Sequence, residues 1–229
     1  MSLVSAEVTQ QITSNGFWAQ EDAAVGKRVD DIVNQGFQFK TEQGLELCKV
    51  TALDDPRIRP VIEFFLPRSV LGFYKAYGRT RQVHCILNRL TPELQILVVQ
   101  IWSSGSEVIF YPGSHTHLLN AVGAQNGLLA IPPDRLNLPG INAKSVEMPN
   151  GGFAIVDARL AFRPLGGKVV MFGFMTPSEV IYWAKMGLPG TLEQKVRDEM
   201  ESQTIGMNFK FQRSEGDGAD DGPSLHRQA

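Results

Sequence analysis

Glu107-Val-Ile-Phe-Tyr-Pro-Gly-Ser-His115 is the most informative segment of this 229-residue chain. Four of its first five residues are β-branched or aromatic, and the Pro-Gly pair that follows is typical of a tight turn after a strand. Ser114 and His115 come directly after that pair. The segment therefore predicts a β-strand that ends in a turn carrying a hydroxyl and an imidazole.

Short strands with turn signals between them surround this segment, from Arg81 to Thr176. Clusters such as Pro132-Pro133 and Pro149-Asn-Gly-Gly152 separate the apolar runs. Short, evenly spaced strands of this kind indicate an antiparallel sandwich or barrel rather than alternating strands and helices. The expected strands are residues 82–87, 94–102, 107–111, 128–131, 145–148, 153–157 and 168–174.

Helical patterns flank the predicted strands. Apolar residues recur at helical spacing from Ala23 to Val33, and Gly36 is expected to end that helix. Residues 60–76 predict two short helices interrupted at Pro67, and residues 177–200 read as helical again. We therefore predict one jelly-roll domain over residues 1–213, mainly β, with N-terminal helices packed outside it. Residues 214–229 are polar and predict a disordered tail.

Composition excludes several functional classes. The formal net charge is −2, so no overall positive charge favours nucleic acid or an anionic membrane. No apolar run is long enough to span a bilayer, and the first twenty residues do not resemble a signal peptide, so we expect a cytoplasmic protein. The two cysteines form no CxxC pair, and no HExxH, GxSxG, Walker or GxGxxG pattern occurs.

The Pro-Gly-Ser-His sequence that ends at His115 resembles a signature of the phytanoyl-CoA dioxygenase family. The stretch from Val146 to Leu160, with its Pro-Asn-Gly-Gly turn followed by Phe-Ala-Ile-Val-Asp, resembles a later stretch of the same family. The resemblance extends from about Gln82 to Phe174. It implies a double-stranded β-helix, also called a cupin-like jelly roll, that uses Fe(II) and 2-oxoglutarate.

The iron ligands that the resemblance implies are incomplete in this sequence. His84 stands where the first ligand is expected, but position 86, which shares its strand face, is Ile rather than Asp or Glu. Ala161-Phe162-Arg163 provides no distal histidine, and residues 169–175 contain no Arg or Lys to pair with 2-oxoglutarate. We therefore expect no metal and no cofactor. The alternative is Fe(II) and 2-oxoglutarate held by unusual ligands.

Candidate catalytic residues are His84, Asp157 and Arg159, because each could move or stabilise a proton. Structural interpretations compete with these roles: His84 as a hydrogen-bonded barrel residue, and Asp157 with Arg159 as an ion pair at a strand end. Aromatic and amide side chains are expected to line an apolar pocket inside the barrel, although they also fit an ordinary core. The expected lining residues are Gln100, Trp102, Tyr111, Phe153 and Phe162.

These observations favour a small-molecule tailoring enzyme of secondary metabolism, a cyclase or isomerase acting on a largely apolar metabolite without oxidation. Two alternatives stay open: an Fe(II)/2-oxoglutarate oxygenase, and a ligand-binding protein without catalytic activity. The expected partner is a small-molecule substrate, with neither nucleic acid nor membrane involved. A homodimer is compatible with the architecture by analogy alone.

Overall fold

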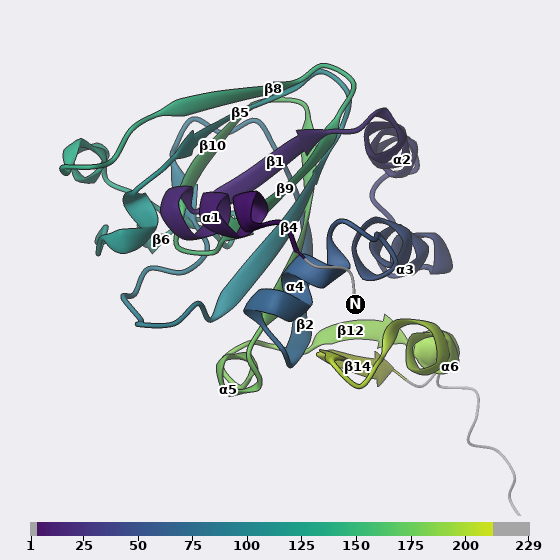
Figure 1. Cartoon of the computed structure of the whole chain (residues 1–229). Helices are drawn as coiled ribbons and strands as arrows, with labels where there is room; N and C mark the ends of the chain where they lie inside the picture. Colours follow the sequence, from purple (N-terminus) through teal and green to yellow (C-terminus); the bar gives the residue numbers. More distant parts are fainter. Residues whose placement is uncertain (1–3, 213–229) are drawn as a thin grey trace, which may run out of the picture.

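Two six-stranded sheets face each other in the computed structural model, which describes residues 4–212 (Figure 1). The first sheet has the order β1-β9-β4-β11-β2-β13, and every pairing in it is antiparallel except that between β13 and β2. Its strands are β1 (Phe17–Glu21), β9 (Gly152–Asp157), β4 (Ile96–Trp102), β11 (Lys168–Met175), β2 (Ser69–Gly78) and β13 (Ile205–Met207).

The second sheet has the order β6-β7-β3-β10-β5-β8 and is antiparallel throughout. Its strands are β6 (Val122–Gly123), β7 (Leu129–Ala130), β3 (His84–Cys85), β10 (Ala161–Gly166), β5 (Ser106–Tyr111) and β8 (Lys144–Met148). Two facing sheets that exchange strands in this order form the predicted double-stranded β-helix, so the predicted fold class is confirmed. The predicted tail, 214–229, lies outside the described residues.

Helices cover the outer face of the first sheet (Figure 1). Side chains of Ser5, Asp22 and Thr41 cap the first three helices by accepting hydrogen bonds from backbone N–H groups one turn on. The helices on this side are α1 (Ala6–Asn15), α2 (Ala23–Asn34), α3 (Glu42–Cys48) and α4 (Arg59–Phe65). The short helices α5 (Pro177–Val180) and α6 (Glu193–Lys195) follow the barrel, together with a small parallel sheet of β12 (Met186–Pro189) and β14 (Phe209–Gln212).

One predicted helix is wrong. Residues 60–76 were expected to form two helices, but only α4 exists, and Ser69–Gly78 is the strand β2. A strand that is covered on both faces carries apolar residues on both, so the alternation that normally identifies a strand is lost. Residues 177–200 were also predicted to be helical, but the strand β12 interrupts that helix.

Strand alternation divides the apolar residues into two cores, one on each face of the first sheet. On β4, Leu97, Val99 and Ile101 face the helices and belong to the outer core. Ile96, Val98 and Trp102 belong to the inner core, which fills the space between the two sheets. The strands of the first sheet therefore contribute to both cores at once.

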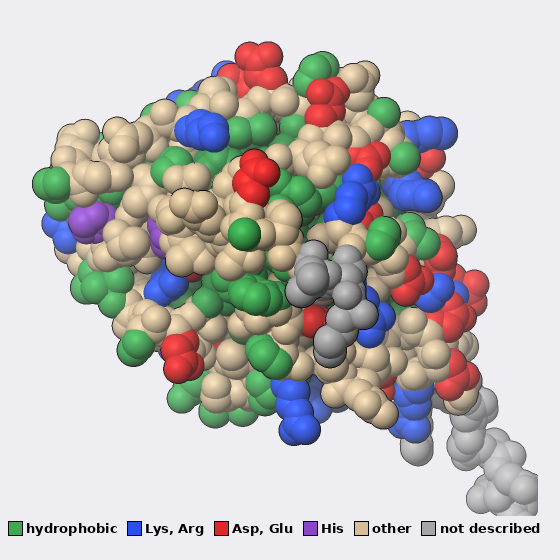
Figure 2. All heavy atoms as spheres, viewed as in Figure 1, with side chains coloured by type: hydrophobic (Ala, Val, Ile, Leu, Met, Phe, Trp, Pro, Cys, Tyr) green, Lys and Arg blue, Asp and Glu red, His purple; other side chains and the backbone are tan. Residues whose placement is uncertain are grey.

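Charged side chains of both signs are mixed over α3 and α6 (Figure 2). Lys195 pairs there with Glu199 at 3.0 Å and approaches Glu46 at 3.8 Å. No helix among residues 4–212 is both long and apolar enough to cross a lipid bilayer.

Candidate active site at the mouth of the barrel

His84 is held at the opening between the two sheets. On β3 it pairs with Phe162 of β10 on one side and with Ala130 of β7 on the other. Directly paired residues share a face, and Phe162 belongs to the inner core, so the imidazole faces the interior. A pocket of about 640 Å³ opens beside it, walled by the segment before β3 and by the β6–β7 hairpin. The lining residues include Thr80, Arg81, Gln82, Gln125 and Asn126.

The His84 imidazole is neutral and incompletely hydrogen-bonded. Only 2% of the residue is exposed, and burial lowers the pKa of His84, opposed in part by a weak interaction with the Gln82 backbone. Its Nε2 lies 3.4 Å from the side-chain nitrogen of Asn126, which can donate to it. Its Nδ1 has no partner of hydrogen-bond geometry within residues 4–212. A neutral imidazole beside a pocket can accept a proton from a bound molecule.

A row of polar side chains continues from this mouth into the barrel. Gln100 of β4 pairs with Met171 of β11, which pairs in turn with Lys75 of β2, so all three face the interior. The next row runs from Trp102 through Val169 to Tyr77 in the same way. At the strand spacing of about 4.8 Å, the Cα atoms of Gln100 and Lys75 are roughly 10 Å apart.

The polar atoms of these two rows lack partners among the described residues. Both side-chain amide atoms of Gln100, the indole nitrogen of Trp102 and the hydroxyl of Tyr77 are buried without a hydrogen bond. Burial raises the pKa of Tyr77 to about 12, so its hydroxyl is a donor at neutral pH. Buried polar groups in proteins are nearly always paired, so these atoms call for a partner outside the chain, such as water or a polar ligand.

Lys75 adds a positive charge to this set. It forms no ion pair or hydrogen bond with another residue in the described part of the chain. Its Nζ reaches the β6–β7 loop, 3.1 Å from where a Cβ would stand at Gly127, next to Asn126 of the His84 pocket. An ammonium, a phenol and an amide that are all unpaired fit a carboxylate.

Sequence reasoning missed Lys75. The basic anchor for 2-oxoglutarate was sought on residues 169–175, whereas the sheet register brings a lysine from β2 into the neighbouring position. Phe73, Lys75 and Tyr77 share one face of β2, but the sequence did not reveal this because the segment was interpreted as a helix.

The residues at this site do not fit an iron ion. No three His, Cys, Asp or Glu side chains within residues 4–212 are grouped so that they could hold a metal. Ile86, in the position of the expected carboxylate, is buried in the inner core, and Phe162 stands across from His84. The unpaired groups of the interior thus fit a carboxylate such as those of 2-oxoglutarate, whereas the imidazole alone does not make an iron site.

Asp157 and Arg159 bind each other rather than the His84 pocket. Arg159 donates from Nε to Oδ1 of Asp157 at 3.0 Å and from Nη2 to Oδ2 at 2.6 Å, and its Nη1 donates to the carbonyl of Thr91 at 2.9 Å. On β9, Asp157 alternates with Val156 of the inner core, so its side chain lies on the opposite face. The structure therefore separates this pair from His84 and gives it the geometry of a buried structural ion pair.

The expected lining residues are divided between two faces. Gln100, Trp102 and Phe162 face the barrel interior. Phe153 instead packs in the outer core, 5.2 Å from Trp18 between ring centroids, and Tyr111 packs outside β10 with Ala161. Strand alternation is the reason: Phe153 and Tyr111 each directly adjoin an inward-facing residue in the chain, so their own side chains point to the opposite face.

The Pro-Gly-Ser-His turn is structural. Ser114 Oγ accepts a hydrogen bond from the backbone N–H of Ala161 at 2.8 Å, and this ties the turn to the start of β10. The Nε2 of His115 lies 3.3 Å from the carbonyl of Thr13 at the end of α1. The turn thus fastens the N-terminal helix to the barrel.

Among the solved structures that share this fold are HygX, EctD and SnoN. HygX from Streptomyces hygroscopicus in its apo form has a TM-score of 0.52 and 11% identity, over 76% of this chain and 88% of HygX. EctD from S. alaskensis in its apo form has a TM-score of 0.51 and 15% identity, over 76% and 78% of the two chains. The epimerase SnoN, in complex with Fe3+, alpha ketoglutarate and nogalamycin RO, has a TM-score of 0.53 and 10% identity, over 74% and 82%.

No protein-family model matches the sequence, and no curated protein matches it. The structural matches overturn the expectation that no cofactor is involved. SnoN holds iron and alpha ketoglutarate on this fold, and EctD has been seen with 2-oxoglutarate and 5-hydroxyectoine. That expectation rested on ligands missing from the sequence. At the level of the fold, the resemblance to the oxygenase family is confirmed.

Proposed function

We propose that this chain is a small-molecule tailoring enzyme that acts in the pocket beside His84 and binds 2-oxoglutarate in the adjoining barrel interior. The observation that carries the proposal is the set of buried side-chain atoms without hydrogen-bond partners at His84, Tyr77, Gln100 and Trp102, with Lys75 on the same face of the first sheet. Similar folds in SnoN and EctD, which bind this keto acid, support it.

Each interior residue has a role in this proposal. Lys75 pairs with a carboxylate of 2-oxoglutarate, and the Tyr77 hydroxyl and the Gln100 amide donate hydrogen bonds to its oxygens. In the oxygenase alternative, 2-oxoglutarate would supply the electrons that reduce dioxygen, whereas proton transfer at His84 does not use them. The surrounding Trp102, Phe162 and Met171 exclude water from that region, which strengthens these interactions.

We further propose that the reaction is an isomerisation, with cyclisation as the related alternative. His84 takes a proton from the substrate and returns it at another position on the same face, so that the proton count does not change. The name of SnoN, a non-heme alpha ketoglutarate dependent epimerase, supports isomerisation as an outcome on this fold, whereas proton transfer by His84 rests on the pocket of this chain. Asp157 and Arg159, paired with each other, maintain the strand end in this scheme rather than touching the substrate.

Binding of 2-oxoglutarate is tested by calorimetry on the wild-type chain and on Lys75→Gln. We expect one site in the wild type and at least a tenfold weaker affinity in the variant, because one charge-assisted hydrogen bond is worth roughly 1.5–3 kcal/mol. Lys210→Gln is the matched control, since this lysine lies on β14, away from the barrel. Equal affinities of the wild type and Lys75→Gln for 2-oxoglutarate would show that Lys75 does not contact it.

Isomerisation is tested by incubating the protein with metabolite mixtures in deuterated water and measuring deuterium uptake by mass spectrometry. The wild type should label its substrate and His84→Gln should not, while Asp157→Asn should still label it in proportion to the folded fraction. Parallel samples with chelator, or with added Fe(II) and 2-oxoglutarate, distinguish proton transfer from oxygenation. A product that gains oxygen only in the presence of Fe(II) would replace isomerisation by the oxygenase alternative.

A further inference from the structure

A second pocket lies on the other side of the first sheet, away from His84. Its volume is about 650 Å³, and its walls come from the α2–α3 connection, β2, α3 and the β12–β14 sheet. Tyr74 forms part of the wall on the outer face of β2, whereas its neighbour Lys75 faces the barrel interior. The apolar walls are Phe37, Phe39, Leu45, Tyr74, Leu188 and Phe209.

The aromatic wall is built at a conformational cost. Phe37 has φ of +55°, in the left-handed region that a bulky residue rarely adopts. Phe37 follows a Schellman motif at the end of α2, in which Gly36 donates to the carbonyl of Val33 at 3.0 Å and Phe37 donates to that of Ile32 at 2.9 Å. The left-handed residue of that motif is Gly36, with φ of +78°, so the motif does not require the positive φ of Phe37. Glycine would adopt this conformation without strain, so the phenyl ring at this position calls for a role.

The rings of the wall are arranged in a series. Phe37 and Phe39 lie 5.7 Å apart between centroids, and Phe39 and Tyr74 lie 4.4 Å apart. The Tyr74 hydroxyl already donates to the carbonyl of Gly44 at 3.0 Å, so this ring offers the pocket its apolar body. Pockets of this size, walled mainly by aromatic and aliphatic side chains, are typical binding sites for small apolar molecules.

One charge stands at this pocket. Lys40 is exposed, lines it, and forms no ion pair with any other residue of the described range. No Asp or Glu is among the lining residues in the part of the chain that the structure describes. An apolar chamber with a single unpaired ammonium complements a molecule that has an apolar body and one negative end.

We propose that this pocket is a second ligand site, outside the barrel, for an apolar organic anion such as a medium-chain fatty acid. The hydrocarbon body packs against the rings of Phe37, Phe39 and Tyr74, and the carboxylate pairs with Lys40. This site is independent of the chemistry at His84, because the first sheet separates the two pockets.

The test is calorimetric titration of the full chain with decanoate, below its micelle concentration, and with decan-1-ol. We expect one site for decanoate and weaker binding of the neutral alcohol. Lys40→Gln should weaken decanoate binding about fivefold and abolish the preference for the acid. The matched control is Lys210→Gln, because Lys210 lies on β14 next to the wall residue Phe209. This variant should bind decanoate like the wild type.

A second variant, Phe37→Gly, separates loss of binding from loss of folding. Glycine relieves the strained conformation while it removes a wall, so we expect about tenfold weaker decanoate binding and no loss of thermal stability. The proposal is overturned if the wild type does not bind decanoate, or if neither Phe37→Gly nor Lys40→Gln changes its affinity. Binding to phosphatidylglycerol vesicles without binding of the free acid would also overturn it, because the ligand would then be a lipid surface.

Discussion

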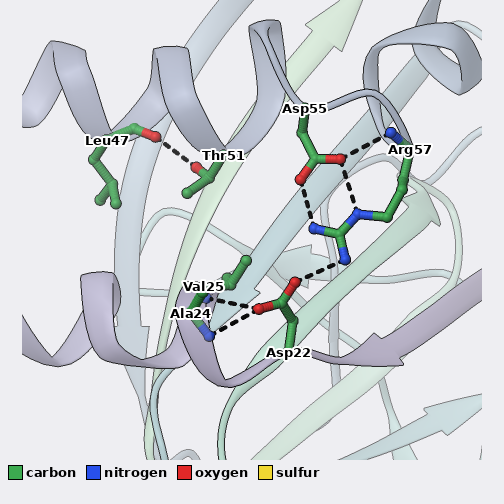
Figure 3. Close-up of polar contacts among 7 residues, drawn as sticks. All are labelled: Asp22, Ala24, Val25, Leu47, Thr51, Asp55 and Arg57. Atoms are coloured by element: carbon green, nitrogen blue, oxygen red, sulfur yellow. Dashed lines mark hydrogen bonds and ion pairs between the residues drawn. The ribbon is translucent and has the colours of Figure 1, made fainter.

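Arg57 joins two segments that are distant in the sequence. Its Nη1 donates to Asp22 at 2.7 Å, ahead of α2, and its Nε and Nη2 donate to Asp55 at 3.0 and 2.6 Å (Figure 3). The guanidinium also lies 4.8 Å from the ring centroid of Phe153 in the outer core. One side chain thereby fixes the start of α2, the turn before α4 and the sheet to one another.

Replacing Arg57 by Gln is expected to lower the free energy of unfolding by about 1–3 kcal/mol, because both carboxylates lose their charged partner. The estimate is below that for a fully buried pair, since about a third of the Arg57 side chain, 35%, is exposed. Urea unfolding measures it. Arg197→Gln, which removes an exposed i,i+4 pair with Glu193, should cost at most about 0.5 kcal/mol.

The stability lost in the Arg57→Gln variant should depend on pH. Burial raises the pKa of Asp22 and of Asp55, but hydrogen bonds to Arg57 and to backbone N–H groups outweigh it, so both pKa values lie below the ordinary 3.8. A carboxyl with a lowered pKa stabilises the fold above its unfolded-state value and loses that contribution as the pH falls through its folded-state value. The difference between wild type and Arg57→Gln should therefore be constant from neutral pH down to about pH 5 and shrink below pH 4. A difference that stays constant down to pH 2 would exclude this origin.

At the scale of elements, α2 packs onto the turn between β8 and β9 through two glycines. A Cβ at Gly26 would stand 2.1 Å from the carbonyl oxygen of Asn150 and 2.8 Å from Cα of Gly151. Gly151 itself has φ of +80°, which a turn of this kind requires. Backbone meets backbone at this contact, so no side chain can move aside.

Gly26→Ala therefore tests helix propensity against packing. Propensity alone predicts a gain of about 1 kcal/mol from Ala inside a helix, whereas overpacking costs about 1–3 kcal/mol or more. We expect packing to dominate, with a net loss of about 1–2 kcal/mol in thermal or urea unfolding. Arg28→Ala, an exposed site on the same helix, should be nearly neutral. A stabilised Gly26→Ala variant would mean that the helix can move away from the turn.

The elements also show what the sequence could and could not predict. The strand before the Pro-Gly turn, the strands with clear turn signals and the helix ending at Gly36 follow from local patterns, and the structure contains them. Strand β2 could not be recognised, because its two faces meet two different cores. The place of Lys75 beside Gln100 depends on the pairing of β2, β11 and β4, which are far apart in the chain. Local patterns carry no information on such pairings.

On the scale of the whole molecule, the two cores share their strands. On β9, Phe153 and Ile155 face the outer core while Ala154 and Val156 face the inner core. The helices cannot leave the outer face without exposing the apolar side of these strands, and the strands cannot separate without opening the inner core. We therefore propose that the shared strands couple the helices and the barrel into one cooperative unit, which the prediction of a single domain requires.

Tryptophans on opposite faces of the first sheet allow a test of this coupling. Trp18 packs against the outer core and Trp102 is fully buried in the inner one. We propose two variants, Trp102→Phe/Trp183→Phe and Trp18→Phe/Trp183→Phe, each of which keeps one of these tryptophans as its fluorescence probe. Within each variant, the urea midpoint from fluorescence should coincide with that from far-ultraviolet circular dichroism, because loss of one core destroys the strands of the other. The comparison is made inside each protein, so the destabilisation caused by the substitutions cancels. A Trp18 midpoint clearly below the dichroism midpoint, with Trp102 coincident, would show that the helical layer unfolds before the barrel and that the chain has two units rather than one.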